Sequence, residues 1–148
     1  MKALVQRVTA ASVTVGDEVV GRIGPGLMVL LGVGREDVAA DADQLAAKVA
    51  NLRLFPKGEA EFDLSVTDSG GSILAVSQFT LLADTKKGRR PSFVAAAPPE
   101  EARVLYDRFV RAMREKGLTV ATGIFREYMQ VEIHNDGPAT VLVESNHA

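Results

Sequence analysis

Two short, continuous apolar runs, Leu27–Val33 and Ile73–Val76, place the strongest constraint on what this chain can fold into. Apolar runs of this length, bounded by turn residues, are typical of strands that are covered on both faces. Turn residues precede both runs, Gly24-Pro25-Gly26 before the first and Ser69-Gly70-Gly71 before the second. The sequence therefore predicts two buried strands.

Other segments show the alternation of half-exposed strands. Ala3–Val15 alternates and resumes, after Gly16-Asp17, as Glu18–Ile23, which predicts a tight hairpin. Residues 59–66 predict another short strand. Near the C-terminus, residues 129–134 alternate, Asn135-Asp136-Gly137-Pro138 is a strong turn signal, and Ala139–Val143 predicts a returning last strand.

Two segments have the period of amphipathic helices. In the first, apolar residues step by four, three, four and three, and Pro56 ends the pattern. The second opens at Pro98-Pro99 with acids after it and closes at Lys116-Gly117. The expected buried stripes are Val38, Ala42, Leu45, Val49 and Leu52 in the first helix, and Ala102, Leu105, Phe109 and Met113 in the second. The prediction is one mixed α/β domain, residues 1–148, with two main helices and a disordered tail at 145–148 that includes His147.

Composition excludes several classes of function. The 148 residues contain no cysteine, which rules out disulfides, thiolate metal sites and cysteine nucleophiles. Only His134 and His147 are present, so we expect no metal centre and no cofactor. The formal charge of −2 disfavours general nucleic-acid binding and leaves that role to a local patch. Charge appears too early for a signal peptide, and no apolar run reaches membrane-spanning length, so we expect a cytoplasmic protein.

The second apolar run ends in the polar segment Ser77-Gln78-Phe79-Thr80-Leu81. If the strand continues, Gln78 and Thr80 share one face and Ser77 lies on the other. Buried hydroxyls and amides need a partner or a ligand. A cationic loop follows, which contains Lys86, Lys87, Arg89, Arg90 and Phe93. A polar strand end beside a cationic loop predicts a site.

The residues alone leave several interpretations open. Thr80 as a nucleophile needs a base, for which only His134 is available, and this defines an esterase or amidase hypothesis. The polar side chains also suit simple bonds to neighbouring backbone. The cations suit either a solvated hairpin tip or a small RNA-binding module, with Phe93 stacking on a base or anchoring the loop. Gly137-Pro138 reads as a plain turn or as a cis peptide, and Gly24-Pro25 is an equal candidate.

Three ordered motifs together resemble the D-aminoacyl-tRNA deacylase family. They are Ser77-Gln78-Phe79-Thr80-Leu81, Lys87-Gly88-Arg89-Arg90-Pro91-Ser92-Phe93 and Asn135-Asp136-Gly137-Pro138-Ala139-Thr140. Shorter stretches are also similar, namely Gln6-Arg7-Val8, Ala11-Ser12-Val13, Leu30-Leu31-Gly32-Val33 and Leu52-Arg53-Leu54-Phe55. The likeness extends from the first residue to about Glu144.

The resemblance implies a barrel-like α/β fold and a homodimeric editing hydrolase. Such an enzyme cleaves the ester of D-aminoacyl-tRNA, accepts glycyl-tRNA, and has its site at the subunit interface. The catalytic positions carried over are Ser77, Gln78, Phe79 and Thr80. A cis Gly137-Pro138 peptide, braced by Arg7, would reach the partner's pocket and reject L-amino acids. The 2′-hydroxyl of the terminal adenosine would help to activate water, and the chain would supply orientation and oxyanion stabilisation.

The resemblance also assigns residues to tRNA binding, and it has two departures. The assigned residues are Lys86, Lys87, Arg89, Arg90, Phe93, Phe125 and Met129. Arg126-Glu127 stands where the family usually carries Gly-Ala, in a region expected near the terminal adenosine. A usual Met-Asn pair is missing around Glu61-Phe62-Asp63.

Overall fold

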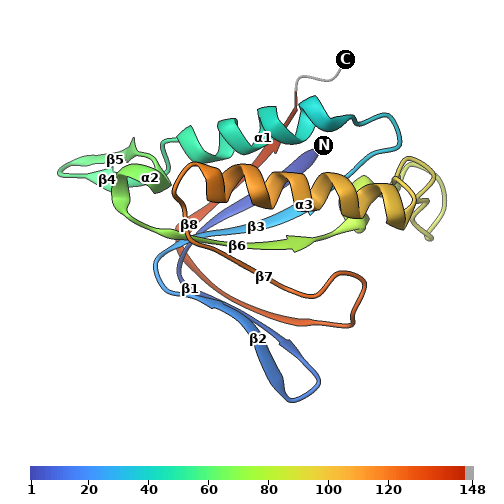
Figure 1. Ribbon diagram of the computed structural model, residues 1–148, viewed down its shortest axis with the longest axis horizontal. Helices are drawn as coiled ribbons and strands as arrows, with labels where there is room; N and C mark the ends of the chain where they lie inside the picture. Colours follow the sequence, from blue (N-terminus) through green and yellow to red (C-terminus); the bar gives the residue numbers. More distant parts are fainter. Residues whose placement is uncertain (146–148) are drawn as a thin grey trace.

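A strongly curved sheet carries two long helices on one face in the computed structural model, which describes residues 1–145 (Figure 1). The main strands are β1 (Lys2–Val15), β2 (Glu18–Ile23), β3 (Gly26–Gly32), β6 (Ser72–Ser77), β7 (Val120–Thr122) and β8 (Gln130–Glu144). The long helices are α1 (Ala39–Asn51) and α3 (Pro99–Glu115). Smaller elements are β4 (Phe55–Lys57), β5 (Ala60–Leu64), α2 (Val66–Ser69) and the 3-10 helix η1 (Phe79–Leu82).

The two apolar runs lie side by side at the centre of the sheet, as predicted. The strand order is β2-β1-β3-β6-β7, with β8 paired to β1. β3, β6 and β7 are parallel, with registers such as Leu27↔Ile73 and Ile73↔Val120, whereas β1 is antiparallel to β2, β3 and β8. The parallel pairs need crossover connections, which α1 and α3 contribute.

The sheet is curved almost into a barrel. Its two ends meet where Gly21 of β2 approaches β7, since an ideal Cβ on Gly21 would lie 2.4 Å from the carbonyl oxygen of Thr122. The curved sheet encloses a small apolar cluster that includes Val13, Met28 and Leu74. A larger core fills the space between the sheet and the helices. The mixed, barrel-like α/β class predicted from the sequence is therefore confirmed.

The helical stripes are confirmed except at both ends of the first, where Leu52 follows α1 as its C-cap residue and is half-buried. Ala42, Leu45 and Val49 are buried, and so are all four apolar residues predicted for α3. Val38 is 55% exposed, because it precedes α1 as its N-cap residue and does not belong to the buried stripe. Arg108 of α3 joins α1 through a bidentate ion pair with Asp43, at 2.9 and 2.7 Å, and this hydrogen-bonded guanidinium lowers the pKa of the Asp43 carboxyl.

The C-terminal hairpin predicted from residues 129–143 is wrong. One strand, β8, runs through the whole segment antiparallel to β1, from Thr14↔Gln130 to Lys2↔Glu144. The Asn135–Thr140 segment does not reverse the chain, because the residues on both sides of it pair with successive parts of β1. The extra residues are accommodated by two register shifts, between Gln6 and Val8 and between Val8 and Ala10.

Ser145, which the sequence assigned to a disordered tail, is buried against the first residue of the chain. Its backbone N–H donates to the carbonyl of Met1 at 3.0 Å, and its hydroxyl accepts from the Met1 amino group at 2.7 Å. The rest of the predicted tail, including His147, lies outside the described residues. Across residues 1–145, none of the helices has the length and apolar character needed to cross a membrane.

Candidate active site

The strand β6 ends at Ser77, so the predicted continuation through Leu81 is wrong. Residues 79–82 form the 3-10 helix η1, and Gln78 and Thr80 do not share a strand face. The Gln78 N–H still donates to the carbonyl of Leu31 at 2.8 Å, after which Leu81 N–H donates back to Gln78 at 3.2 Å. The reversal places a polar, solvent-accessible turn at the carboxyl end of a central strand.

Gly32, at the end of β3, makes room for this turn. An ideal Cβ on Gly32 would lie 2.7 Å from Leu82 Cδ2, 3.0 Å from Leu81 Cβ and 3.2 Å from the Gln78 carbonyl oxygen. Ordinary contacts of a Cβ are 3.4 Å or longer. The missing side chain therefore lets η1 pack directly on the neighbouring strand.

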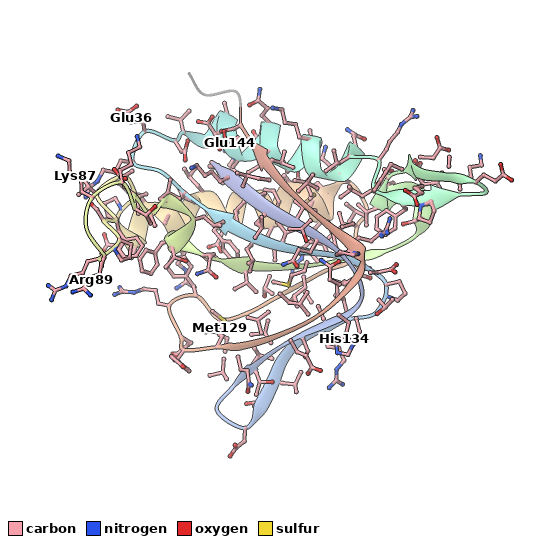
Figure 2. All side chains as sticks on the ribbon, turned by 180° about the vertical axis from the view of Figure 1, so that it is seen from behind. Glu36, Lys87, Arg89, Met129, His134 and Glu144 are labelled. Atoms are coloured by element: carbon pink, nitrogen blue, oxygen red, sulfur yellow. The ribbon has the colours of Figure 1, made fainter. Side chains whose placement is uncertain are left out.

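The polar side chains of the turn bond to one another. Gln78 Nε2 donates to Thr80 Oγ1; Gln78 is half-buried and Thr80 is exposed. His134 lies on β8 opposite Ala10, and its Nε2 is 2.9 Å from Glu132 Oε1. In Figure 2, His134 lies far from the loop that carries Lys87 and Arg89. The structure thus gives Thr80 an amide partner and does not bring it to the histidine that a nucleophile would need.

The cationic loop is attached to the turn through an aromatic pair. The Phe79 ring, 55% exposed, meets the Phe93 ring edge-on with centroids 5.0 Å apart. Two backbone hydrogen bonds between Asp84 and Ser92, of 2.8 and 2.9 Å, close the loop. Its tip carries the exposed side chains of Lys86, Lys87, Arg89 and Arg90 (Figure 2). The predicted neighbourhood of polar turn and cationic loop is therefore present.

Phe125 and Met129 meet Ser77 on the other side of the turn. A small pocket is lined by Val76, Ser77, Tyr106, Gly123, Ile124, Phe125 and Met129. Figure 2 shows Met129 at the start of β8, below the sheet in that view. Gly123 allows the close approach, because an ideal Cβ there would lie 2.6 Å from Met129 Sδ. Two residues assigned only by resemblance thus share a pocket with the end of β6.

Tyr106 is a site residue that the sequence analysis missed. Its hydroxyl donates to the Ala75 carbonyl at 2.7 Å, and its ring lies 6.1 Å from that of Phe125. Burial raises the pKa of Tyr106 to about 12, so the phenol stays protonated near neutral pH and does not serve as a base. Its position, four residues after Ala102 on the apolar stripe of α3, was the available signal.

Arg126 adopts a conformation that favours glycine. Its φ is +68°, in the left-handed region that L-residues with side chains rarely occupy. The resemblance places glycine at this position, and this chain has a glycine-like backbone conformation there although its residue is arginine.

The Asn135–Thr140 segment is held by two side chains. Asn135 Nδ2 donates to Gln6 Oε1 at 3.0 Å and to Thr140 Oγ1 at 2.9 Å, while its Oδ1 accepts from the Ala139 N–H at 2.8 Å. Arg7 Nε donates to the Asp136 carbonyl at 2.9 Å and Nη1 to the Leu54 carbonyl at 2.6 Å. The Gly137-Pro138 peptide bond is cis in this structure.

This loop does not meet Ser77 within one chain. Ser77 pairs with Leu31, which pairs with Ala3 and so with Val143, whereas the loop leaves β1 between Gln6 and Val8. The two features are thus three strands apart and about four residues apart along the strands. Strand spacing and rise place them about 20 Å from each other.

The residues described in the structure include no cluster of three histidine, aspartate or glutamate side chains that could hold a metal ion. The polar turn and its exposed aromatic neighbour Phe79 present hydrogen-bonding groups and a ring face to solvent. The backbone of η1 contributes to this, because the first N–H groups of a helix have no partner inside it.

Comparison with known proteins gives a consistent set of relatives. A family model described as D-Tyr-tRNA(Tyr) deacylase matches residues 4–144. Proteins named D-aminoacyl-tRNA deacylase from Dehalococcoides mccartyi and Symbiobacterium thermophilum are each 57% identical to this chain over 145 residues. These alignments cover 98% of this chain and 95% and 96% of the two relatives.

Two solved structures have a similar fold. One, titled c-Myc DNA Unwinding Element Binding Protein, superposes with a TM-score of 0.93 at 44% identity and covers 99% of this chain and 100% of its own. The other, titled as a structural analysis of a probable eukaryotic D-amino acid tRNA deacylase, has a TM-score of 0.85 at 18% identity and covers 97% and 98%. At that identity the second likeness shows the fold alone.

Proposed function

Since this chain belongs to the D-Tyr-tRNA(Tyr) deacylase family and is a D-aminoacyl-tRNA deacylase, a hydrolase of aminoacyl-tRNA esters, we propose that the polar turn Ser77–Thr80 is where the ester is cleaved. The observation that carries this proposal is the shared pocket of Ser77, Phe125 and Met129 beside that turn. The terminal adenosine lies on the outer side of this small pocket, with its base against the Phe125 ring.

The chain contributes orientation and charge stabilisation rather than a protein base. Gln78 and Thr80 bond to each other, Tyr106 stays protonated, and His134, the histidine among the described residues, bonds to Glu132 on β8. The vicinal 2′-hydroxyl of the tRNA assists the attacking water, and amide N–H groups at the start of η1 stabilise the oxyanion that develops. Holding ester and water in reacting geometry supplies much of the remaining acceleration.

A complete site needs two copies of the chain. The Gly137-Pro138 loop lies about 20 Å from Ser77 in one chain, on the strand spacing and rise of a sheet. In a homodimer the loop of one protomer enters the pocket of the other. The outer strand β8 supports this arrangement, because within residues 1–145 it pairs with β1 alone and presents Val141 and Leu142 to solvent, 37% and 52% exposed.

The loop decides chirality by exclusion. Asn135 and Arg7 hold it rigidly, so its backbone leaves no room for the side chain of an L-aminoacyl ester. Glycine has no Cβ to clash, and glycyl-tRNA is therefore also a substrate. Lys86, Lys87, Arg89 and Arg90 contact tRNA phosphates, with Phe93 anchoring their loop on Phe79. Charged tRNA is made in the cytoplasm, and we place the enzyme there.

The test is deacylation of D-tyrosyl-tRNA and L-tyrosyl-tRNA by the purified protein. We expect loss of the D-ester with the L-ester intact, and little turnover of D-tyrosyl-tRNA with a 2′-deoxy terminal adenosine. Equal loss of both esters, abolished by Thr80→Ala, would establish the nucleophilic esterase. Salt-sensitive RNA binding without hydrolysis would leave only the binding module.

The two-chain site has its own test. An ideal Cβ on Gly137 would lie 2.9 Å from Arg7 Nη2 and 2.8 Å from the Ala139 nitrogen. Gly137→Ala therefore displaces the loop and should raise hydrolysis of L-tyrosyl-tRNA. Dimers mixed from this variant and Phe79→Ala should contain one intact site and recover selective activity. Failure of mixing to recover it would contradict a shared site.

A further inference from the structure

A groove along α3 carries three arginines that the proposed function does not yet use. Arg103, Arg111 and Arg114 line it from the helix, and Thr122, Gly123, Ile124 and Phe125 form its other wall. We call this feature the arginine groove; its cavity volume is about 530 Å³. The arginines are spaced by eight and three residues, which puts them on one face of the helix over about 16 Å.

The arginine groove starts at the candidate active site. It shares Tyr106, Gly123, Ile124 and Phe125 with the pocket that contains Ser77. The Arg103 guanidinium lies over the Phe125 ring at 5.7 Å, which marks the end nearest Ser77. Arg114 donates from Nη2 to the Val120 carbonyl at 2.8 Å, which marks the far end beside the start of β7. A ligand that lies against Phe125 beside Ser77 can therefore continue along α3.

The arginine groove is positive although the chain as a whole is negative. Three guanidinium groups line it, and Asp107 is the acid among its lining residues. Asp107 interacts with Arg103, at 3.8 Å, on an exposed surface where such a pair is weak. Among the described residues no carboxylate forms an ion pair with Arg111, although the Arg111 charge contributes to the lowered pKa of Asp43 on α1. The Arg111 guanidinium can therefore still contact an anion from outside.

We propose that the arginine groove binds the sugar-phosphate backbone of the tRNA nucleotides immediately before the terminal adenosine. This inference rests on the proposed function, because it takes the terminal adenosine to lie against Phe125 beside Ser77. The 3′ strand then leaves along α3, with Arg111 contacting a phosphate directly and Arg103 stacked beside the first base step. A narrow, positive, partly aromatic groove is what single-stranded nucleic acid requires.

The experiment compares a long and a short substrate. Arg111→Gln is assayed on D-tyrosyl-tRNA and on D-tyrosyl-adenosine, which lacks every phosphate. Arg22→Gln is the matched control, an exposed arginine on β2 outside both pockets. We expect a five- to tenfold rise in KM for D-tyrosyl-tRNA with kcat nearly kept, and no change for the adenosine ester. These values are about what the loss of one charged phosphate contact produces.

Salt dependence gives a second readout. The slope of log kcat/KM for D-tyrosyl-tRNA against log salt should become shallower by about 0.7 in Arg111→Gln, as expected for one single-strand phosphate contact. Equal losses on both substrates, or an unchanged KM and slope, would overturn the inference. If the wild type cleaves only the tRNA ester, binding of a fluorescent CCA-ended hairpin RNA is measured by anisotropy instead. An Arg111→Gln protein with the Kd and the salt dependence of the wild type would then overturn the inference. A wild type that cleaves neither ester refutes the proposed function itself.

Discussion

Gly32→Ala tests whether the packing of η1 on β3 positions the active site. The added Cβ would lie 3.0 Å from Leu81 Cβ and 3.2 Å from the Gln78 carbonyl oxygen, both shorter than ordinary contact. The nearest atom, Leu82 Cδ2 at 2.7 Å, ends a flexible side chain and can rotate away. The turn must then move outward by a few tenths of an ångström, since Gly32 is held in β3.

The expected cost has two parts. Overpacking of this size lowers the free energy of unfolding by about 1–2 kcal/mol, which corresponds to a fall in Tm of about 3–6 °C for a chain of this length. We expect a marked fall in kcat as well, because a displacement of about 1 Å in an active site lowers the rate on the order of a hundredfold. A shift of a third to a half of that distance predicts a drop in kcat of about tenfold.

The assay measures Tm by circular dichroism and kcat for D-tyrosyl-tRNA at a temperature where both proteins are folded. Gly24→Ala is the matched control, because an ideal Cβ on Gly24 meets no atom within 4 Å. We expect Gly24→Ala to keep wild-type values. A Gly32→Ala protein with the Tm and kcat of Gly24→Ala would refute the reasoning that Gly32 positions the turn.

Four further predictions concern stability. Tyr106→Phe leaves the Ala75 carbonyl without its side-chain donor, and we expect the free energy of urea unfolding to fall by about 1–2 kcal/mol. The control Tyr128→Phe removes a hydroxyl from a side chain that is 94% exposed and should not change that free energy measurably. Because folding raises the pKa of Tyr106 from 10.0 to about 12, the native state retains that proton longer; stability should be fully present below pH 10 and fall by about 2–3 kcal/mol between pH 10 and 12, a slope that Tyr106→Phe should remove. Arg126→Gly should raise stability by about 0.5–1 kcal/mol by relieving the left-handed conformation, and a loss would contradict that assignment. Gly26→Ala should cost about 3 kcal/mol or more, seen as a much lower urea midpoint, because its Cβ would lie 1.9 Å from the Ser72 carbonyl oxygen.

Local patterns predicted the elements well where short-range physics decides them. The apolar stripe of α3 and the strands at Ala3–Val15 and Glu18–Ile23 follow from side-chain period and turn residues, and the structure agrees. The errors occurred where the next contact is distant in sequence. Asn135–Pro138 reads as a hairpin turn, yet β8 continues, because pairing with β1 on both sides outweighs the local turn preference.

The candidate site divides in the same way. Ser77, Gln78 and Thr80 stood out in the sequence as polar residues after a buried strand, but their turn depends on the space beside Gly32. The residue pattern could not predict that Ser77, Phe125 and Tyr106 lie together, because this depends on the crossover from β6 through α3 to β7. The family resemblance predicted Phe125 as a site residue and did not indicate Tyr106.

The sequence by itself determined the α/β class, the buried strands, the two long helices and the family, because spacing of apolar residues and ordered motifs are local properties. Only the tertiary structure decided that β6 stops at Ser77, that the Gly137-Pro138 loop lies far from it in the same chain, and that three arginines of α3 form a groove leading from the pocket. These depend on which strands become neighbours and how the sheet curves, and such contacts between distant residues leave little trace in local patterns.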